Sequence, residues 1–169
     1  FAFGSHVGAG LRFGPGGVIS TYVSGGLLSN PNGLVFDGSG NLFVANYAFP
    51  SGGKIIRVAP NGTMTAFSCL LGSGGGAVVF DGAGNLYAAE YIQNSITRIT
   101  PQGVASTFKG SVSSPTGLVF DAAGNLFVGN QGYGGSTPGI TKITPAGVVS
   151  TVGSGSPFNY VNGLAFDSA

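Results

Sequence analysis

The sequence predicts an all-β fold. Three observations lead there: a pentapeptide that recurs four times, an almost regular spacing between its copies, and four short β-like runs within each spacing. Gly-Leu-Val-Phe-Asp or a close variant ends at Asp37, Asp81, Asp121 and Asp167, and successive aspartates lie 40 to 46 residues apart. A repeat of this length is typical of a four-stranded propeller blade. We therefore expect a β-propeller of four four-stranded blades.

Each repeat predicts its four strands in a fixed order. The first strand is the apolar run before the aspartate, and the second, such as residues 42–45, follows a glycine-containing turn and is apolar on both faces. In the third strand apolar and polar side chains alternate, as in Ile56-Arg57-Val58, and the strand ends at a proline. The fourth is rich in Thr, Val and Ser, and it follows a hairpin turn that needs a permissive glycine.

The two ends of the chain predict parts of one repeat. Residues 1–5 align with 42–46, and residues 18–22 align with 63–67, so the amino terminus supplies strands two to four of a blade. The missing first strand is the apolar run 163–166. We expect this strand to close a ring on its own chain, because the covalent tether raises its effective concentration. Strand exchange with a neighbouring molecule is the alternative, because an unpaired strand exposes backbone donors and acceptors.

The whole chain is thus expected to form one domain, residues 1–169. Its repeats cover residues 1–30 with 161–169, 31–74, 75–114 and 115–160.

The second repeat runs Pro-Asn-Gly-Leu-Val-Phe-Asp-x-x-Gly-Asn-Leu-Phe-Val-Ala-Asn and then Ile-Ile-Arg-Val-Ala-Pro-Asn-Gly, and in this form it resembles an NHL repeat. The resemblance covers essentially the whole chain. It implies a propeller similar to gluconolactonases, streptogramin lyase and the peptide α-amidating lyase, a group that also holds noncatalytic scaffolds, sensors and RNA-binding domains. Those relatives generally have six blades, so four repeats leave open a small ring or part of a larger one.

Composition excludes several classes of function. Of the 169 residues 43% are hydrophobic, which is ample for a core, but only 7% are charged, against about 25% in an ordinary soluble domain. A net charge of +1 without a basic run argues against nucleic acid and membrane surfaces as partners. One cysteine permits no internal disulfide. The chain opens at Phe1 without an initiator methionine or a signal-peptide pattern, so we expect a mature product or an excised piece.

Most charged residues recur at equivalent positions of the repeat. Four acids precede the turn after the first strand, and four bases lie on the third strand: Asp37, Asp81, Asp121, Asp167, Arg12, Arg57, Arg98 and Lys142. We expect a structural role for both sets, with each carboxylate accepting backbone N–H groups of its turn and pairing with a base. The functional alternative is two stacked charged rings.

The candidates for chemistry are the charges that break the repeat. Glu90 stands at the end of a second strand where Asn46 and Asn130 stand in other repeats. By resemblance to the catalytic relatives, these three residues could form an oxygen-rich site for Ca²⁺ or Mg²⁺. We expect instead a hydrogen-bonded polar belt. His6 follows the same strand end and is the candidate general base, although no Ser-His-Asp or His-Glu arrangement accompanies it.

Three further features have a bland and a functional interpretation. Tyr47, Tyr91 and Tyr133 would suit carbohydrate stacking if they share a face, but such tyrosines more often pack at blade edges. Cys69 is expected to be a buried small hydrophobe. Asn61 begins the sequon Asn-Gly-Thr at a predicted exposed hairpin tip, where a glycan could be accommodated.

The low charge favours a noncatalytic module, because uncharged surfaces suit packed protein contacts. We expect this module to associate with itself, in an oligomer or fibre, or with another protein. We expect it outside the cytoplasm or on the cell surface. The alternative is a metal-dependent lyase or lactone hydrolase of the group that the repeat resembles, and a further alternative is a carbohydrate-binding propeller.

Overall fold

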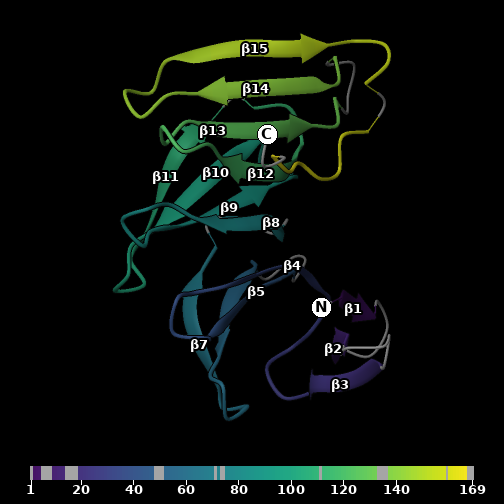
Figure 1. The fold of residues 1–169 in the computed structure, drawn as a ribbon, viewed down its shortest axis with the longest axis vertical. Coiled ribbons are helices and arrows are strands. Elements are labelled where there is room, and N and C mark those ends of the chain that lie inside the picture. The colour runs from purple at the N-terminus through teal and green to yellow at the C-terminus, as the bar shows by residue number, and fades with distance from the viewer. Residues whose placement is uncertain are drawn as a thin grey trace.

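Among the residues that the computed structural model describes, every regular element is a β-strand. The described residues are 2–4, 9–13, 19–47, 52–70, 72, 75–110, 112–132, 137–158 and 160–166. The strands form three four-stranded antiparallel sheets and one three-stranded sheet, as Figure 1 shows. The prediction of an all-β fold of four-stranded sheets is confirmed. The described residues contain no helix that could span a lipid bilayer.

Each sheet is a meander in which neighbours in sequence are neighbours in space. The first sheet contains β1 (Ala2–Gly4), β2 (Ala9–Phe13) and β3 (Ile19–Ser24). The second contains β4 (Pro31–Phe36), β5 (Leu42–Asn46), β6 (Lys54–Val58) and β7 (Met64–Cys69). The third contains β8 (Gly75–Phe80), β9 (Leu86–Glu90), β10 (Ser95–Ile99) and β11 (Ala105–Gly110). The fourth contains β12 (Pro115–Phe120), β13 (Leu126–Asn130), β14 (Gly139–Ile143) and β15 (Val149–Ser154).

The core lies between successive sheets, and the second strand of a sheet serves both of its neighbours. Leu42 and Val44 of β5 pack in a cluster with the first sheet, whereas Phe43 and Ala45 pack in a cluster with the third. Successive side chains of a strand point to opposite faces, so a strand between two interfaces must be apolar on both. All five residues of β5 are buried, as are all five of β9.

An aromatic side chain of the inner strands β8 and β12 packs on the second strand of the preceding sheet. Phe80 of β8 meets Phe43 of β5 edge to face, with ring centroids 5.1 Å apart. Phe120 of β12 meets Tyr87 of β9 in the same way at 5.0 Å. The inner strands approach closely as well, because a Cβ at Gly33 would lie 2.2 Å from the carbonyl oxygen of Gly76.

A β-bulge on the outer strands β7 and β11 places a second aromatic ring in the inter-sheet contact. The register between β6 and β7 shifts between Ile55 and Ile56, which leaves Phe67 as the extra residue. Its ring packs edge to face on Phe43 at 5.0 Å. A bulge re-aims one side chain of a strand, and here it turns an outer-strand aromatic toward the core. Phe108 packs on Tyr87 in the equivalent position of the third sheet.

The carboxyl-terminal segment does not show the predicted ring closure. Residues 160–166 form no strand, and the sheet of β1–β3 has three strands among the described residues. Phe166 instead packs on Phe127 of β13, with centroids 5.1 Å apart, and the Thr116 hydroxyl donates to the Val161 carbonyl. The segment therefore lies on the fourth sheet as β8 lies on the second. The same aromatic contact that joins successive sheets holds it there.

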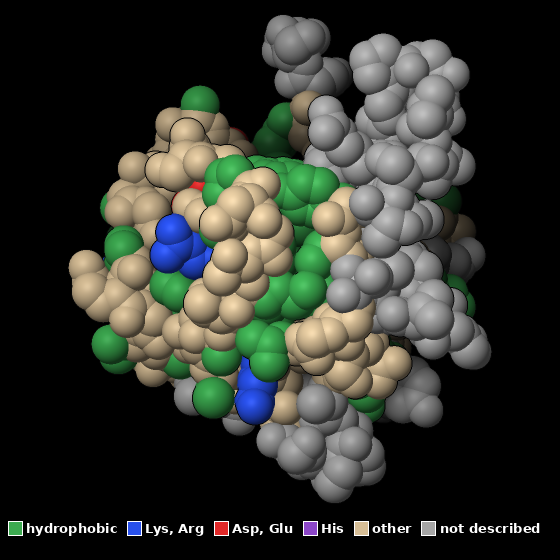
Figure 2. Space-filling model, turned by 90° about the horizontal axis from the view of Figure 1, so that it is seen from below, with side chains coloured by type: hydrophobic (Ala, Val, Ile, Leu, Met, Phe, Trp, Pro, Cys, Tyr) green, Lys and Arg blue, Asp and Glu red, His purple; other side chains and the backbone are tan. Residues whose placement is uncertain are grey.

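The surface agrees with the composition. In the face seen in Figure 2, apolar and uncharged polar side chains cover most of the described area, and few Lys, Arg, Asp or Glu side chains interrupt them. Apolar residues of the outer strand β15 are exposed as well, since Val149 is 45% exposed and Val152 is 56% exposed.

Phe67→Ala is expected to lower the free energy of unfolding by about 2 kcal/mol, because a half-buried ring in the inter-sheet contact is lost. Val152→Ala removes the residue at the equivalent bulge of the fourth sheet, and as an exposed side chain it should cost less than about 0.5 kcal/mol. Urea unfolding of both variants measures the difference. Equal losses would contradict the assigned role of the bulge.

Candidate functional site

The turn between the first and second strands is held by its aspartate. In the second sheet Oδ1 of Asp37 accepts the backbone N–H groups of Ser39 and Asn41, at 2.9 and 2.8 Å, and Oδ2 accepts the Asn41 side-chain amide at 2.7 Å. Gly40 supplies the positive φ of 79° that the turn requires. Asp81 and Asp121 make the same three bonds with their own turns.

The basic residue of the third strand lies beside this turn. Arg57 donates from Nη2 to Oδ1 of Asn41 at 3.1 Å, so the asparagine bridges the guanidinium and the Asp37 carboxylate. Lys142 lies 5.5 Å from the ring centroid of Phe127 and near Asp121. Asp167 is outside the described residues, and the side chain of Arg12 is not described either.

The turn hydrogen bonds hold the three carboxylates in their charged form. In Asp121 the side-chain bond from Asn125 is the largest influence, and it lowers the pKa below the ordinary value of 3.8. In Asp37 and Asp81 burial is the largest single influence and raises the pKa, but the bonds from the turn together outweigh it, so both values are also lowered. A carboxylate that accepts several N–H bonds resists protonation.

Acid is therefore expected to weaken the fold through these turns. A carboxyl group whose pKa is lower in the folded state stabilises it fully above 3.8, and this stabilisation is lost as the pH falls below 3.8 through the folded value. Thermal unfolding followed by circular dichroism from neutral pH to about pH 2 should show a falling midpoint. Asp121→Asn should make that fall smaller, and an unchanged slope in this variant would contradict the assignment.

At the opposite end of the second strands, two asparagines hold the segments that connect the sheets. Asn46 donates from Nδ2 to the Leu27 carbonyl at 2.6 Å and accepts the Ser29 N–H at Oδ1. Asn130 accepts the Ser113 N–H at Oδ1, and its Nδ2 donates to the Thr141 hydroxyl at 2.9 Å. Both side chains are 4% exposed. Each therefore binds the linker that leads into its own sheet.

Glu90 occupies the third of these positions and is fully buried. The Thr97 hydroxyl donates to Oε1, and Oε2 lies against the linker between the second and third sheets. A Cβ built at Gly72 of that linker would come within 2.2 Å of Oε2 and of the Gln93 side chain. Only glycine leaves room for the carboxylate beside the backbone here. Glu90 thus contacts the linker at the place where Asn46 and Asn130 contact theirs.

The trio does not fit the Ca²⁺ or Mg²⁺ site that was the alternative to a polar belt. A hard cation needs several oxygen atoms aimed at one point. The amide oxygens of Asn46 and Asn130 instead accept N–H groups of two different linkers, and the Glu90 carboxylate lies against a third. Within the described residues, no group of three His, Cys, Asp or Glu side chains could hold a metal ion.

The remaining candidates are dispersed or outside the described residues. His6 and Tyr133 are outside them. Tyr47 and Tyr91 are half-buried at the linker end of their strands, and Asn61 is exposed on its hairpin, where its side chain accepts the Thr63 N–H at 3.0 Å. The prediction that Cys69 is buried is wrong: its thiol is exposed, because it ends the outermost strand β7 opposite the exposed Lys54.

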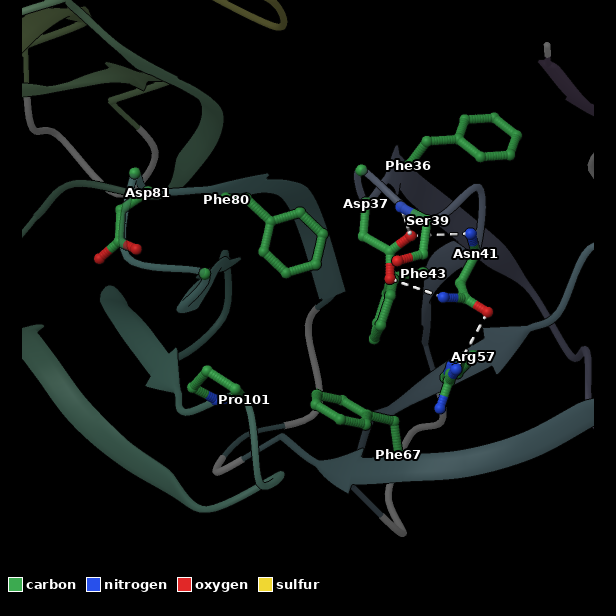
Figure 3. A pocket seen from close by; sticks show the side chains of 13 residues that line it. Phe36, Asp37, Ser39, Asn41, Phe43, Arg57, Phe67, Phe80, Asp81 and Pro101 are labelled. Carbon is green, nitrogen blue, oxygen red and sulfur yellow. Dashed lines mark hydrogen bonds between the residues drawn. The ribbon is translucent and has the colours of Figure 1, made fainter.

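A pocket between the second and third sheets was not predicted from the sequence. It encloses about 500 Å³ at the end of the sheets that carries the aspartate turns. Figure 3 shows the rings of Phe43, Phe67 and Phe80 around it, with Arg57 and Asp37 on one side. An equivalent pocket of about 570 Å³ lies between the third and fourth sheets. Pockets of this size, with aromatic walls and a few polar groups, are typical of small-molecule sites.

Comparison with solved structures identifies the class of fold as a β-propeller. The chain matches a streptogramin B lyase with a TM-score of 0.72 at 20% identity, over 90% of this chain and 50% of the other. It matches virginiamycin B lyase from Staphylococcus aureus with a TM-score of 0.68 at 20% identity, over 87% of this chain and 49% of the lyase. It matches a gluconolactonase from Xanthomonas campestris with a TM-score of 0.75 at 16% identity, over 94% of this chain and 58% of the gluconolactonase.

The chain therefore spans about half the length of these propellers. No family model and no curated protein matches the sequence. At the level of fold, the comparison confirms the resemblance to the group of gluconolactonases and streptogramin lyase.

The comparison also corrects the expected function. A noncatalytic structural module was the first expectation, but the three solved propellers named above are enzymes. The expectation relied on the low content of charge, which describes the surface and not a reaction centre.

Gly72→Ala is expected to destabilise the fold by about 1–3 kcal/mol, because the added methyl group overlaps Oε2 of the buried Glu90. Glu90→Asn shortens the side chain, so the double variant should lose less than the sum of the two single changes. Gly82→Ala is the control, because nothing lies within 4 Å of its Cβ position. Strict additivity in urea unfolding would show that Glu90 and Gly72 do not contact each other.

Proposed function

We propose that this chain supplies four blades of a propeller enzyme that acts as a lyase or a lactone hydrolase. One observation carries the proposal: the fold matches a streptogramin B lyase, virginiamycin B lyase and a gluconolactonase over 87 to 94% of the chain. Composition removes the competing uses of such repeats in RNA binding, since the net charge is only +1.

Among the described residues, Glu90 is the one acidic side chain that does not belong to an aspartate turn. An amide cannot transfer a proton at neutral pH, whereas a carboxyl group can, so Glu90 differs in chemistry from Asn46 and Asn130 at the equivalent positions. We assign proton transfer to Glu90, with the Thr97 hydroxyl orienting Oε1. A substrate reaches the carboxyl group only when the linker at Gly72 is displaced, because that backbone lies against Oε2.

Two substrates follow from the names of the matching enzymes. Hydrolysis of gluconolactone releases acid and is measured in a pH-stat, and cleavage of virginiamycin B is measured by mass spectrometry. We expect turnover of at least one. Glu90→Gln, which keeps the shape of the side chain, should lower the rate about 100-fold or more.

Lys54→Gln is the matched control, because it removes an exposed charge of the second sheet and should leave the rate unchanged. Turnover of neither substrate above the uncatalysed rate would contradict the proposed function. Full activity in Glu90→Gln would leave the enzyme class standing and remove Glu90 from the reaction.

A further inference from the structure

We propose that the pocket between the second and third sheets binds a neutral sugar. The equivalent pocket between the third and fourth sheets would bind a second sugar. The inference does not rest on the proposed function. The first pocket lies at the end of the sheets that carries the aspartate turns, whereas Glu90 ends β9 at the other end, four residues and about 13 Å from the turn.

The wall of the first pocket is aromatic. Phe43 is 5% exposed and fixed by edge-to-face contacts with Phe67 and Phe80, both of which are half-buried and line the pocket. Pro101, which is exposed, lines it on the side of the third sheet, as Figure 3 shows. The C–H face of a pyranose packs on such rings, and the rings lose little conformational freedom because the sheets already hold them.

The rim offers both donors and acceptors. The exposed Arg57 guanidinium carries five N–H groups, and one of its nitrogens is directed to Asn41. Asp37 accepts three hydrogen bonds from its turn, and two carboxylate oxygens provide about four acceptor positions. Ser39 adds a hydroxyl group on an exposed turn residue. Sugar hydroxyl groups donate and accept, so they can use all three side chains.

The charges select against an anionic ligand. Asp37 and Asp81 line the pocket together with Arg57, and the turn hydrogen bonds keep both carboxylates ionised at neutral pH. An anionic ligand would meet two carboxylates against one guanidinium. A neutral ligand with many hydroxyl groups avoids this repulsion and can still hydrogen-bond to all three side chains.

The second pocket repeats this chemistry one sheet further on. Tyr87, Phe108 and Phe120 provide its aromatic wall, and Arg98 with Asp121 takes the place of Arg57 with Asp81. The Tyr87 hydroxyl bonds to Asp81, which adds a polar group that the first pocket lacks. Two sites on one rigid chain would bind a polysaccharide more tightly than a monosaccharide, because the second contact is intramolecular.

The test is a titration with methyl glycosides of glucose, galactose, mannose and N-acetylglucosamine, followed by amide shifts in NMR spectra. The backbone amide signals of Ser39 and Asn41 report binding in the first pocket, and those of Ala83 and Asn125 report binding in the second. We expect at least one glycoside to shift both pairs with a dissociation constant on the order of 1 mM. Arg57→Gln should weaken binding about tenfold at the first pair and leave the second pair unchanged.

Arg98→Gln should produce the reverse pattern. Lys54→Gln is the control, because it removes an exposed cation at the far end of β6 and should change neither affinity. Three results would overturn the inference: no glycoside shift at about 50 mM, far above such a dissociation constant; equal weakening by Lys54→Gln; or shifts at these residues caused by benzoate or benzyltrimethylammonium and not by glycosides. None of these results bears on lyase or lactonase turnover.

Discussion

The structure depends on one contact, the edge-to-face packing of a second-strand aromatic ring against the inner strand of the next sheet. Phe43 meets Phe80, Tyr87 meets Phe120 and Phe127 meets Phe166, all with centroids close to 5 Å apart. No β-sheet is stable alone when both faces are apolar, so each sheet needs this contact to bury its second strand. Even the carboxyl-terminal segment, which pairs with no described strand, is placed by it.

The repeat made the sheets and their turns predictable. Residues close in sequence determine the order of the strands, the prolines and glycines that end them, and the aspartate turn. The hydrogen bonds from Asn41 to Asp37 are an example. The bulge at Phe67 was not predictable in this way, because it is a shift of register between two strands. The third strand also departs from simple alternation: Ile55 and Ile56 are both buried, since sheets pack on both sides of β6.

The site was predicted less well because it is made by packing between sheets. Asn46, Glu90 and Asn130 share a repeat position, but the structure turns each toward its own linker, and sequence spacing does not contain that direction. Cys69 was expected to be buried because cysteine is a small apolar side chain. It lies at the end of an outer strand, where no further sheet covers it, and it is exposed. The inter-sheet pockets combine residues of two repeats, such as Phe43 and Phe80, so no motif within one repeat reveals them.

The three hydrophobic clusters each join two successive sheets. Energetics of this kind are those of a one-dimensional array, in which stability is a sum over units and nearest-neighbour interfaces. A defect in one interface then lowers the stability of two sheets and reaches distant sheets only through the units between them. Cooperativity along the chain is therefore set by the strength of these interfaces.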